Sequence, residues 1–200
     1  MISEVGAMFA LLGYFGAFSK TFSALGAYII LMLTTLVMKM YMVAMFMLCY
    51  KFNRDISSWD VSKVIKFRHT FQECKVFNQD ISGWDVSQVT DMSSMFFYCK
   101  NFNQDISGWD VSNVTNMREM FKYSKFNQDI SIWNTSNVTT MVYMFNNSDF
   151  NNGGKPTDLA KWNFRKVQNI RFMFSGSKFK EPDDFKNWNI PDGVYTSDMF

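Results

Sequence analysis

The sequence predicts a repeat solenoid of stacked short β-strands, with a short helical or 3-10 segment in each turn and an apolar helical segment before the first turn. Two observations lead to this class. Near-identical segments recur along the chain, and all six tryptophans fall at one place in the repeat. A fixed period of this kind is the signature of proteins built from stacked units.

The period is about 25 residues. The segment from Phe102 to Phe121 reads FNQDISGWDVSNVTNMREMF, and Phe77 to Phe96 reads FNQDISGWDVSQVTDMSSMF. Successive tryptophans are separated by 25, 25, 24, 29 and 26 residues, and each follows an aspartate by four. The glycines and proline of NNGGKPT, residues 151–157, predict a loop that lengthens one copy. The structural repeat positions are Asp55, Trp59, Asp80, Trp84, Asp105, Trp109, Asp129, Trp133, Asp158, Trp162, Asp184 and Trp188.

Two periodicities alternate within one copy. The stretch DISGW, residues 105–109, is short and suits a strand-like segment with turn chemistry at its glycine. Val114, Met117, Met120 and Phe121 then fall on one face of a short helix. An oxygen of the preceding aspartate or serine is expected to cap that helix.

Stacking in register would line up the polar residues in columns. Asn53, Asn78, Asn103, Asn127 and Asn151 form one expected column, in which amide side chains bond along the stack. The aspartates form another, and their oxygens are expected to cap the turn of their own copy. A row of cations such as calcium is the alternative, but the glycine-rich nonapeptide of calcium-binding β-rolls is absent. We therefore predict no metal and no cofactor.

Three cysteines, Cys49, Cys74 and Cys99, are spaced by 25 residues, and serines occupy the next positions in phase. A disulfide between neighbouring copies is one interpretation. The other, which the odd number of cysteines favours, is a requirement for a small side chain that Cys and Ser both meet.

The repeat resembles the 25-residue repeat of mycoplasma lipoprotein-like and other bacterial surface proteins. The stretch MFFYC, residues 95–99, is similar to the AFxxC stretch of BspA-type leucine-rich repeats. The resemblance covers about residues 42–200. It implies a leucine-rich-repeat-like solenoid, surface display and protein binding, and it implies no catalytic residue.

The chain divides into an apolar segment, 1–41, and a solenoid of about six 24–29-residue repeats, 42–200. Residues 21–38 are uncharged over a length that approaches a membrane span. Residues 5–38 could thus contact a membrane as an anchor; the alternatives are an apolar cap on the first turn and a misread coding sequence. The last copy shows no polar cap, so the chain is expected to be a fragment or to assemble through that end.

The predicted function is a non-catalytic, surface-displayed repeat scaffold for protein–protein interaction or adhesion, located at a membrane or cell surface. The alternative is a structural component of a larger assembly, such as a virion or envelope layer, built through the solenoid ends. One histidine and no nucleotide-binding or zinc-spacing motif argue against an enzyme, and the balanced charge argues against nucleic acid. Binding residues are expected at variable positions, which are Lys63, Gln88, Asn113 and Asn137, the stretch IKFRH (65–69) and the stretch MREMFKY (117–123).

Overall fold

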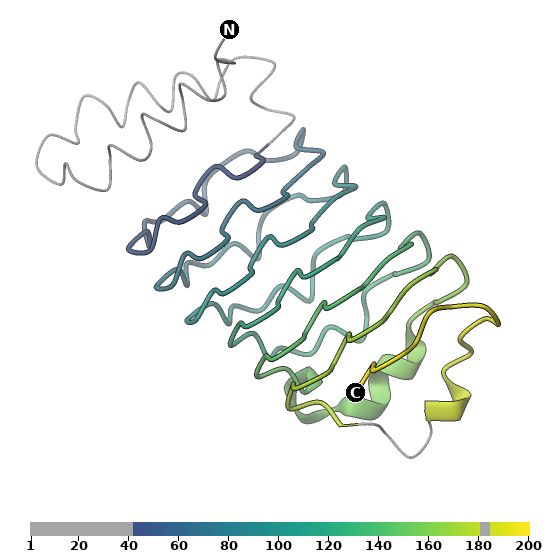
Figure 1. The fold of residues 1–200 in the computed structure, drawn as a ribbon. Coiled ribbons are helices and arrows are strands. Elements are labelled where there is room, and N and C mark those ends of the chain that lie inside the picture. The colour runs from purple at the N-terminus through teal and green to yellow at the C-terminus, as the bar shows by residue number, and fades with distance from the viewer. Residues whose placement is uncertain (1–41, 181–184) are drawn as a thin grey trace, which may run out of the picture.

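The computed structural model describes residues 42–180 and 185–200, which form a stack of coils, each one sequence repeat long (Figure 1). The regular helices within these ranges are three short 3-10 helices: η1 (Asn152–Gly154), η2 (Pro156–Lys161) and η3 (Phe185–Asn187). Neighbouring coils also share one parallel β-bridge each, which pairs Lys66 with Asp91, Asp91 with Asn116, Asn116 with Thr140, Thr140 with Asn169, and Asn169 with Tyr195.

The predicted leucine-rich-repeat-like solenoid of strands and helical segments is wrong. The described part of the chain contains no β-strand and no α-helix. The expected strand DISGW is a turn, in which the N–H of Trp109 donates to the carbonyl of Ile106 at 3.1 Å. The expected helix is also made of turns, because the N–H of Met120 donates three residues back to Met117 at 3.3 Å.

Two consecutive turns replace the helix in each coil. In the segment 92–99 the N–H of Met95 donates to the carbonyl of Met92, and the N–H of Cys99 donates to Phe96. The third residue of each turn, Ser94 or Tyr98, has a positive φ of 53° or 57°, as a type II turn requires. These left-handed residues recur twice per coil and interrupt any extended strand.

Backbone hydrogen bonds also join each pair of turns to the next coil. Every second N–H of the segment 92–98 points along the stack and donates to a carbonyl of the following coil at 2.8–3.0 Å. The four bonds run from Met92 to Asn116, from Ser94 to Arg118, from Phe96 to Met120 and from Tyr98 to Lys122. An α-helix would direct these donors within its own segment, so the inter-coil bonds and a helix exclude each other.

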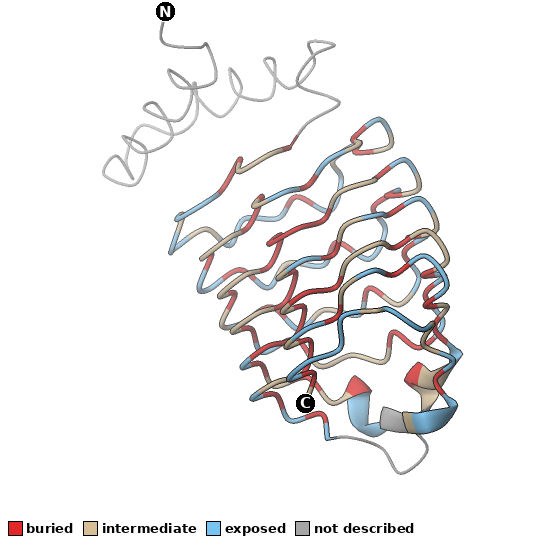
Figure 2. Cartoon of the chain, turned by 45° about the vertical axis from the view of Figure 1, so that its right-hand side comes forward, coloured by how far each residue is buried: buried red, intermediate tan, exposed pale blue. Residues whose placement is uncertain are grey.

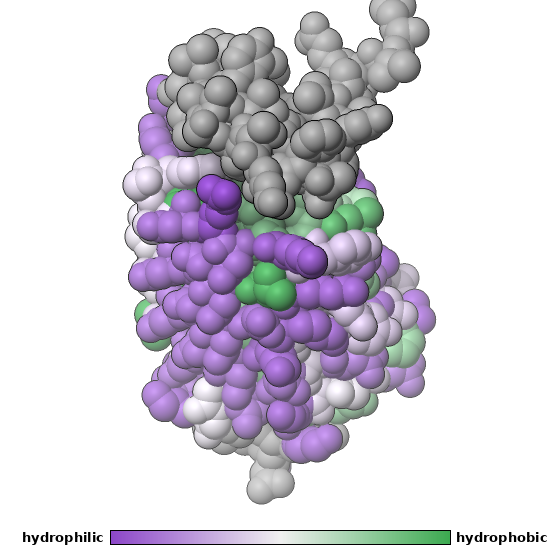
Figure 3. Space-filling model, turned by 90° about the vertical axis from the view of Figure 1, so that its left-hand side faces the viewer, coloured by the Kyte–Doolittle hydropathy of each residue, from purple (hydrophilic) through white to green (hydrophobic). Residues whose placement is uncertain are grey.

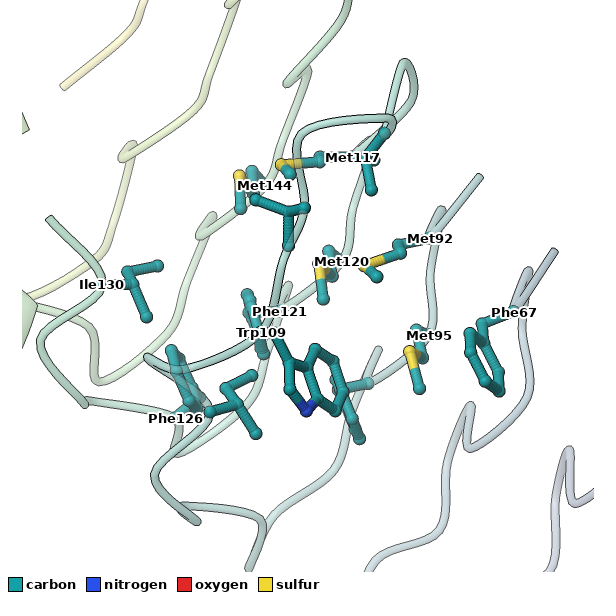
Figure 4. Close-up of a cluster of buried hydrophobic side chains, with 14 of the residues drawn as sticks. Phe67, Met92, Met95, Trp109, Met117, Met120, Phe121, Phe126, Ile130 and Met144 are labelled. Carbon is teal, nitrogen blue, oxygen red and sulfur yellow. The ribbon is translucent and has the colours of Figure 1, made fainter. Parts of the chain in front are cut away.

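The core consists of side chains stacked along the axis of the coils. Buried residues recur in each successive coil (Figure 2). Figure 4 shows Met92, Met95, Trp109 and Phe121 from successive coils projecting into a shared interior. One column contains phenylalanines with ring centroids 5.5–5.7 Å apart, which are Phe46, Phe71, Phe96, Phe121, Phe145, Phe174 and Phe200. A second column, Phe52, Phe77, Phe102, Phe126, Phe150 and Phe179, interleaves with the first.

The apolar segment 1–41 lies outside the described residues, so its expected helical structure and its membrane contact stay predictions. Within 42–180 and 185–200, no helix has the length and apolar character needed to cross a membrane.

Candidate interaction surface

The predicted aspartate positions are turn-capping residues. The Oδ1 atoms of Asp55, Asp80, Asp105 and Asp129 each accept the N–H of the serine two residues later, at 2.9–3.1 Å. These are Asx turns, which close the loop before each tryptophan. Asp158 instead lies in η2 and pairs with Lys161 at 3.3 Å, while Asp184 falls outside the described residues.

Hydrogen bonds from the serines stabilise the ionised form of Asp55, Asp80 and Asp129. The hydroxyl and N–H of Ser82 hold the pKa of Asp80 below its ordinary value. At Asp129 the hydroxyl of Ser131, its N–H and the ammonium of Lys155 together lower the pKa to about 2.

The tryptophans join one coil to the preceding one. Trp84, Trp109, Trp133 and Trp162 are buried, and the Nε1–H of each donates to the carbonyl of an isoleucine one coil earlier at 3.1–3.2 Å. Trp188 is equally buried, yet its Nε1 has no hydrogen-bond partner. Trp59, in the first coil, is only partly buried.

The asparagine column bonds along the stack as the sequence indicated. The Oδ1 of Asn53 accepts the N–H of Asn78 at 2.9 Å, and each later asparagine repeats the contact up to Asn151. The cysteines are free thiols and form no disulfide. The thiols of Cys74 and Cys99 donate to carbonyls of the preceding coil, so a small buried side chain is the correct interpretation.

Within the described ranges, no cluster of three or more His, Cys, Asp or Glu side chains is arranged to hold a metal ion. The expected absence of a cofactor and of catalytic residues stays a prediction.

The exposed side of the paired turns carries aromatic and cationic side chains that recur from coil to coil. We call this side the turn face and define it as the outward-pointing residues of 42–50, 67–75, 92–100, 117–125, 141–149 and 170–178. These segments contain eight lysines and arginines but only three aspartates and glutamates. Because the core residues of each segment point inward, the turn face is free to vary without loss of packing.

Tyrosines and lysines of successive coils form a continuous ladder along the turn face. The Nζ of Lys75 lies 4.5 Å from the ring centroid of Tyr50 and 5.7 Å from that of Tyr98. Lys100 lies 4.1 Å from Tyr98 and 5.9 Å from Tyr123. Each contact is a cation–π interaction, and all of them except the one between Lys100 and Tyr98 join neighbouring coils.

The same ladder continues toward the C-terminal coils. The Nζ of Lys122 lies 5.4 Å from the ring of Tyr123 and 4.0 Å from that of Tyr143. Tyr143 stacks on Phe172 with ring centroids 4.8 Å apart. The tyrosine–lysine ladder therefore consists of Tyr50, Lys75, Tyr98, Lys100, Lys122, Tyr123, Tyr143 and Phe172.

Four rings of the ladder occupy positive-φ positions of the turns. Tyr98, Tyr123, Tyr143 and Phe172 have φ values of 57°, 60°, 58° and 57°. An aromatic residue in this region is strained by about 1–2 kcal/mol relative to glycine. Tyr98 and Tyr123 share one column with Asn147 and Gly176, whereas Tyr143 and Phe172 share the other with Ser94 and Glu119, so the fold requires an aromatic residue in neither column.

Outside the turn face, the middle coils carry negative charge. Segments 76–91, 101–116 and 126–140 contain six aspartates and no lysine or arginine. Figure 3 shows that one side of the stack is hydrophilic over most of its area. The coils thus separate charge between the basic turn face and the acidic segments.

The predicted variable positions divide between the two surfaces. The stretch MREMFKY contributes Lys122 and Tyr123 to the ladder, and IKFRH contributes Arg68 and His69 to the turn face. Asn113 and Asn137 lie elsewhere and donate to serine carbonyls of the preceding coil. Sequence reasoning missed Tyr50, Lys75, Tyr98 and Lys100, which recur near the end of the paired turns, and Tyr143, which lies in the first turn of its pair.

Comparison with known proteins gives a family but no function. The family model described as a Mycoplasma protein of unknown function, DUF285, matches residues 17–125 and 104–200. A search of curated proteins and a search of solved structures each found no significant match. Because the two matched regions together cover most of the sequence, the chain belongs to the DUF285 family of Mycoplasma proteins.

Proposed function

We propose that the protein is a non-catalytic repeat scaffold that binds a protein partner through its turn face. The observation that carries this proposal is the tyrosine–lysine ladder, a continuous row of aromatic and cationic side chains whose ring positions also accept non-aromatic residues in other coils. Tyrosine is among the residues most enriched at the energetic centres of protein interfaces.

The surface location follows from the same proposal. A scaffold for adhesion would be displayed at a membrane or cell surface, with residues 5–38 as its anchor. The resemblance of the repeat to those of mycoplasma lipoprotein-like surface proteins supports this placement.

Site-specific photocrosslinking tests the proposal. A photoreactive phenylalanine analogue at Tyr98, on the ladder, is compared with one at Lys161, an exposed residue of η2 that lies outside both the turn face and the aspartate-bearing segments, in the full chain on intact cells of the source organism. We expect a discrete protein adduct from position 98 that is absent at 161. Equal labelling from both positions, or no adduct from 98, would reject the turn face as the binding surface.

A further inference from the structure

We propose that the ligand of the turn face includes a second copy of this chain, which docks its aspartate-bearing segments onto the tyrosine–lysine ladder. This inference rests on the proposed function, because it names an occupant for the same face. Two observations support it, which are the opposite charges of the lysine and aspartate rows and their equal spacing of one coil.

The lysine side of the proposed contact is accessible to a partner. Lys75 and Lys125 are exposed, and Lys100 is partly exposed; the three recur once per coil. The tyrosine rings beside Lys75 and Lys100 keep the ammonium groups in a row along the stack. A row of this kind fits a partner that presents negative charges at the same interval.

The chain itself presents such charges. Asp80, Asp85, Asp105 and Asp110 are exposed, and they recur once per coil like the lysines. No lysine or arginine of the described residues forms an ion pair with these four carboxylates. A second copy therefore matches the ladder in both sign and spacing, because both rows are set by the same stacking of coils.

The charge of Asp85 and Asp110 exceeds what the fold requires. Asn134 and Asn163 occupy the same column as Asp85 and Asp110, and their Oδ1 atoms accept the same turn N–H at 3.0–3.1 Å. Stacking also places like charges next to each other, since Asp85 raises the pKa of Asp110 although hydrogen bonds from Ser112 lower it more. A cationic partner would relieve this repulsion.

Individual exposed ion pairs are weak, so the association is expected to depend on several pairs and to be sensitive to salt. Sedimentation velocity of the full 200-residue chain should show concentration-dependent dimers or larger species at about 50 mM salt and monomer at about 500 mM. Association through the apolar residues 5–38 would instead persist at high salt.

Two variants each remove one side of the contact. The base variant carries Lys75→Gln, Lys100→Gln and Lys125→Gln, and the acid variant carries Asp80→Asn, Asp85→Asn, Asp105→Asn and Asp110→Asn. Asparagine keeps the turn bond, as Asn134 shows. We expect each variant alone to lose at least about tenfold in association constant. The matched control, Lys51→Gln, Lys63→Gln and Lys180→Gln, removes equal charge outside the turn face and should associate like the wild type.

Mixing the two variants is the decisive measurement. The base variant retains its aspartates and the acid variant retains its ladder, so an equimolar mixture should form a 1:1 dimer that neither forms alone. A monomeric mixture, a wild type that is monomeric at low salt, or a control as weak as the base variant would overturn the inference. A wild type that is monomeric yet binds polyglutamate, or that crosslinks a foreign protein from position 98, would overturn it while leaving the proposed function standing.

Discussion

At the scale of single residues, each coil depends on a few side chains that reach into a neighbouring coil. The tryptophan Nε1–H and the cysteine thiol donate to backbone carbonyls of the preceding copy, and the asparagine Oδ1 accepts a backbone N–H of the following copy. Buried polar groups need such partners, because an unpaired donor loses its bonds to water without replacement. Trp188 is the exception in the described chain, and it therefore offers an internal comparison.

We predict that Trp109→Phe destabilises the protein more than Trp188→Phe does. Both changes remove similar buried volume, but only Trp109 donates to a carbonyl, that of Ile81. The difference in the free energy of unfolding should be about 0.5–1.5 kcal/mol, the usual net contribution of one hydrogen bond. Urea unfolding monitored by circular dichroism measures it, and equal losses for the two variants would contradict the assigned bond.

The cysteines should differ in reactivity according to burial. Burial raises the pKa of the thiols of Cys74 and Cys99, and both are fully enclosed, whereas Cys49 is only partly buried. We expect a thiol reagent at pH 8 to label Cys49 first and the other two only as the chain unfolds, because the thiolate is the reactive form. Peptide mass spectrometry over time follows the three sites. Early labelling of Cys99 would show that the coils open locally.

At the scale of elements, the unit of the fold is the pair of turns. Its buried residues, such as Met92, Met95, Phe96 and Cys99, have the spacing i, i+3, i+4, i+7. An amphipathic helix buries the same set, so the hydrophobic pattern predicted a helix where two turns occur. The sequence correctly indicated which residues are inside and where the Asx turns lie. It did not reveal the left-handed residues, because serine, glutamate and tyrosine occupy positions where glycine or asparagine would have signalled them.

Substitution at Glu73 tests the turn geometry. Its φ is 60°, so Glu73→Val should be about 1–2 kcal/mol less stable than Glu73→Gly, because a β-branched residue is strained in the left-handed region. The same valine substitution at Lys51, which has no positive φ, serves as the control and should have a smaller effect. Thermal unfolding of the three variants measures the difference. If Glu73→Val matched Glu73→Gly, the segment would have to be helical after all.

At the scale of the whole molecule, the fold separates charge although the composition is balanced. The turn face is basic, and aspartates are the charged residues on the other sides of the middle coils. The phenylalanine columns lie within the stack. This segregation follows from repetition, since one acidic position per copy becomes a row when copies stack. A row of ionised carboxylates also makes stability depend on pH.

We predict that the protein loses stability as the pH falls from about 4 toward 2. The pKa of Asp129 is about 2 in the folded chain, below the value of about 3.9 for an unfolded aspartate. A depressed folded pKa contributes stability above the unfolded value, and the contribution disappears as the pH falls through the folded one. Asp55, Asp80, Asp85 and Asp110 have lowered pKa values as well and add in the same direction.

The variant Asp129→Asn isolates one part of this effect. It should be less stable than the wild type at pH 6, because it loses the Lys155 ion pair. The difference in the free energy of unfolding between the two proteins should close by pH 2. Urea unfolding across this pH range measures both curves. A gap that stayed constant with pH would show that the carboxylate charge of Asp129 does not contribute.

The sequence by itself determined the period, the buried residues of each copy and the aspartates that close its turns, because these depend on local spacing and on side-chain chemistry within one repeat. Only the tertiary structure decided that the chain forms paired turns and that tyrosines and lysines of different coils meet in a ladder. The physical reason is that both outcomes depend on the neighbouring copy. The inter-coil hydrogen bonds of Met92, Ser94, Phe96 and Tyr98 exist only when the next coil is in place.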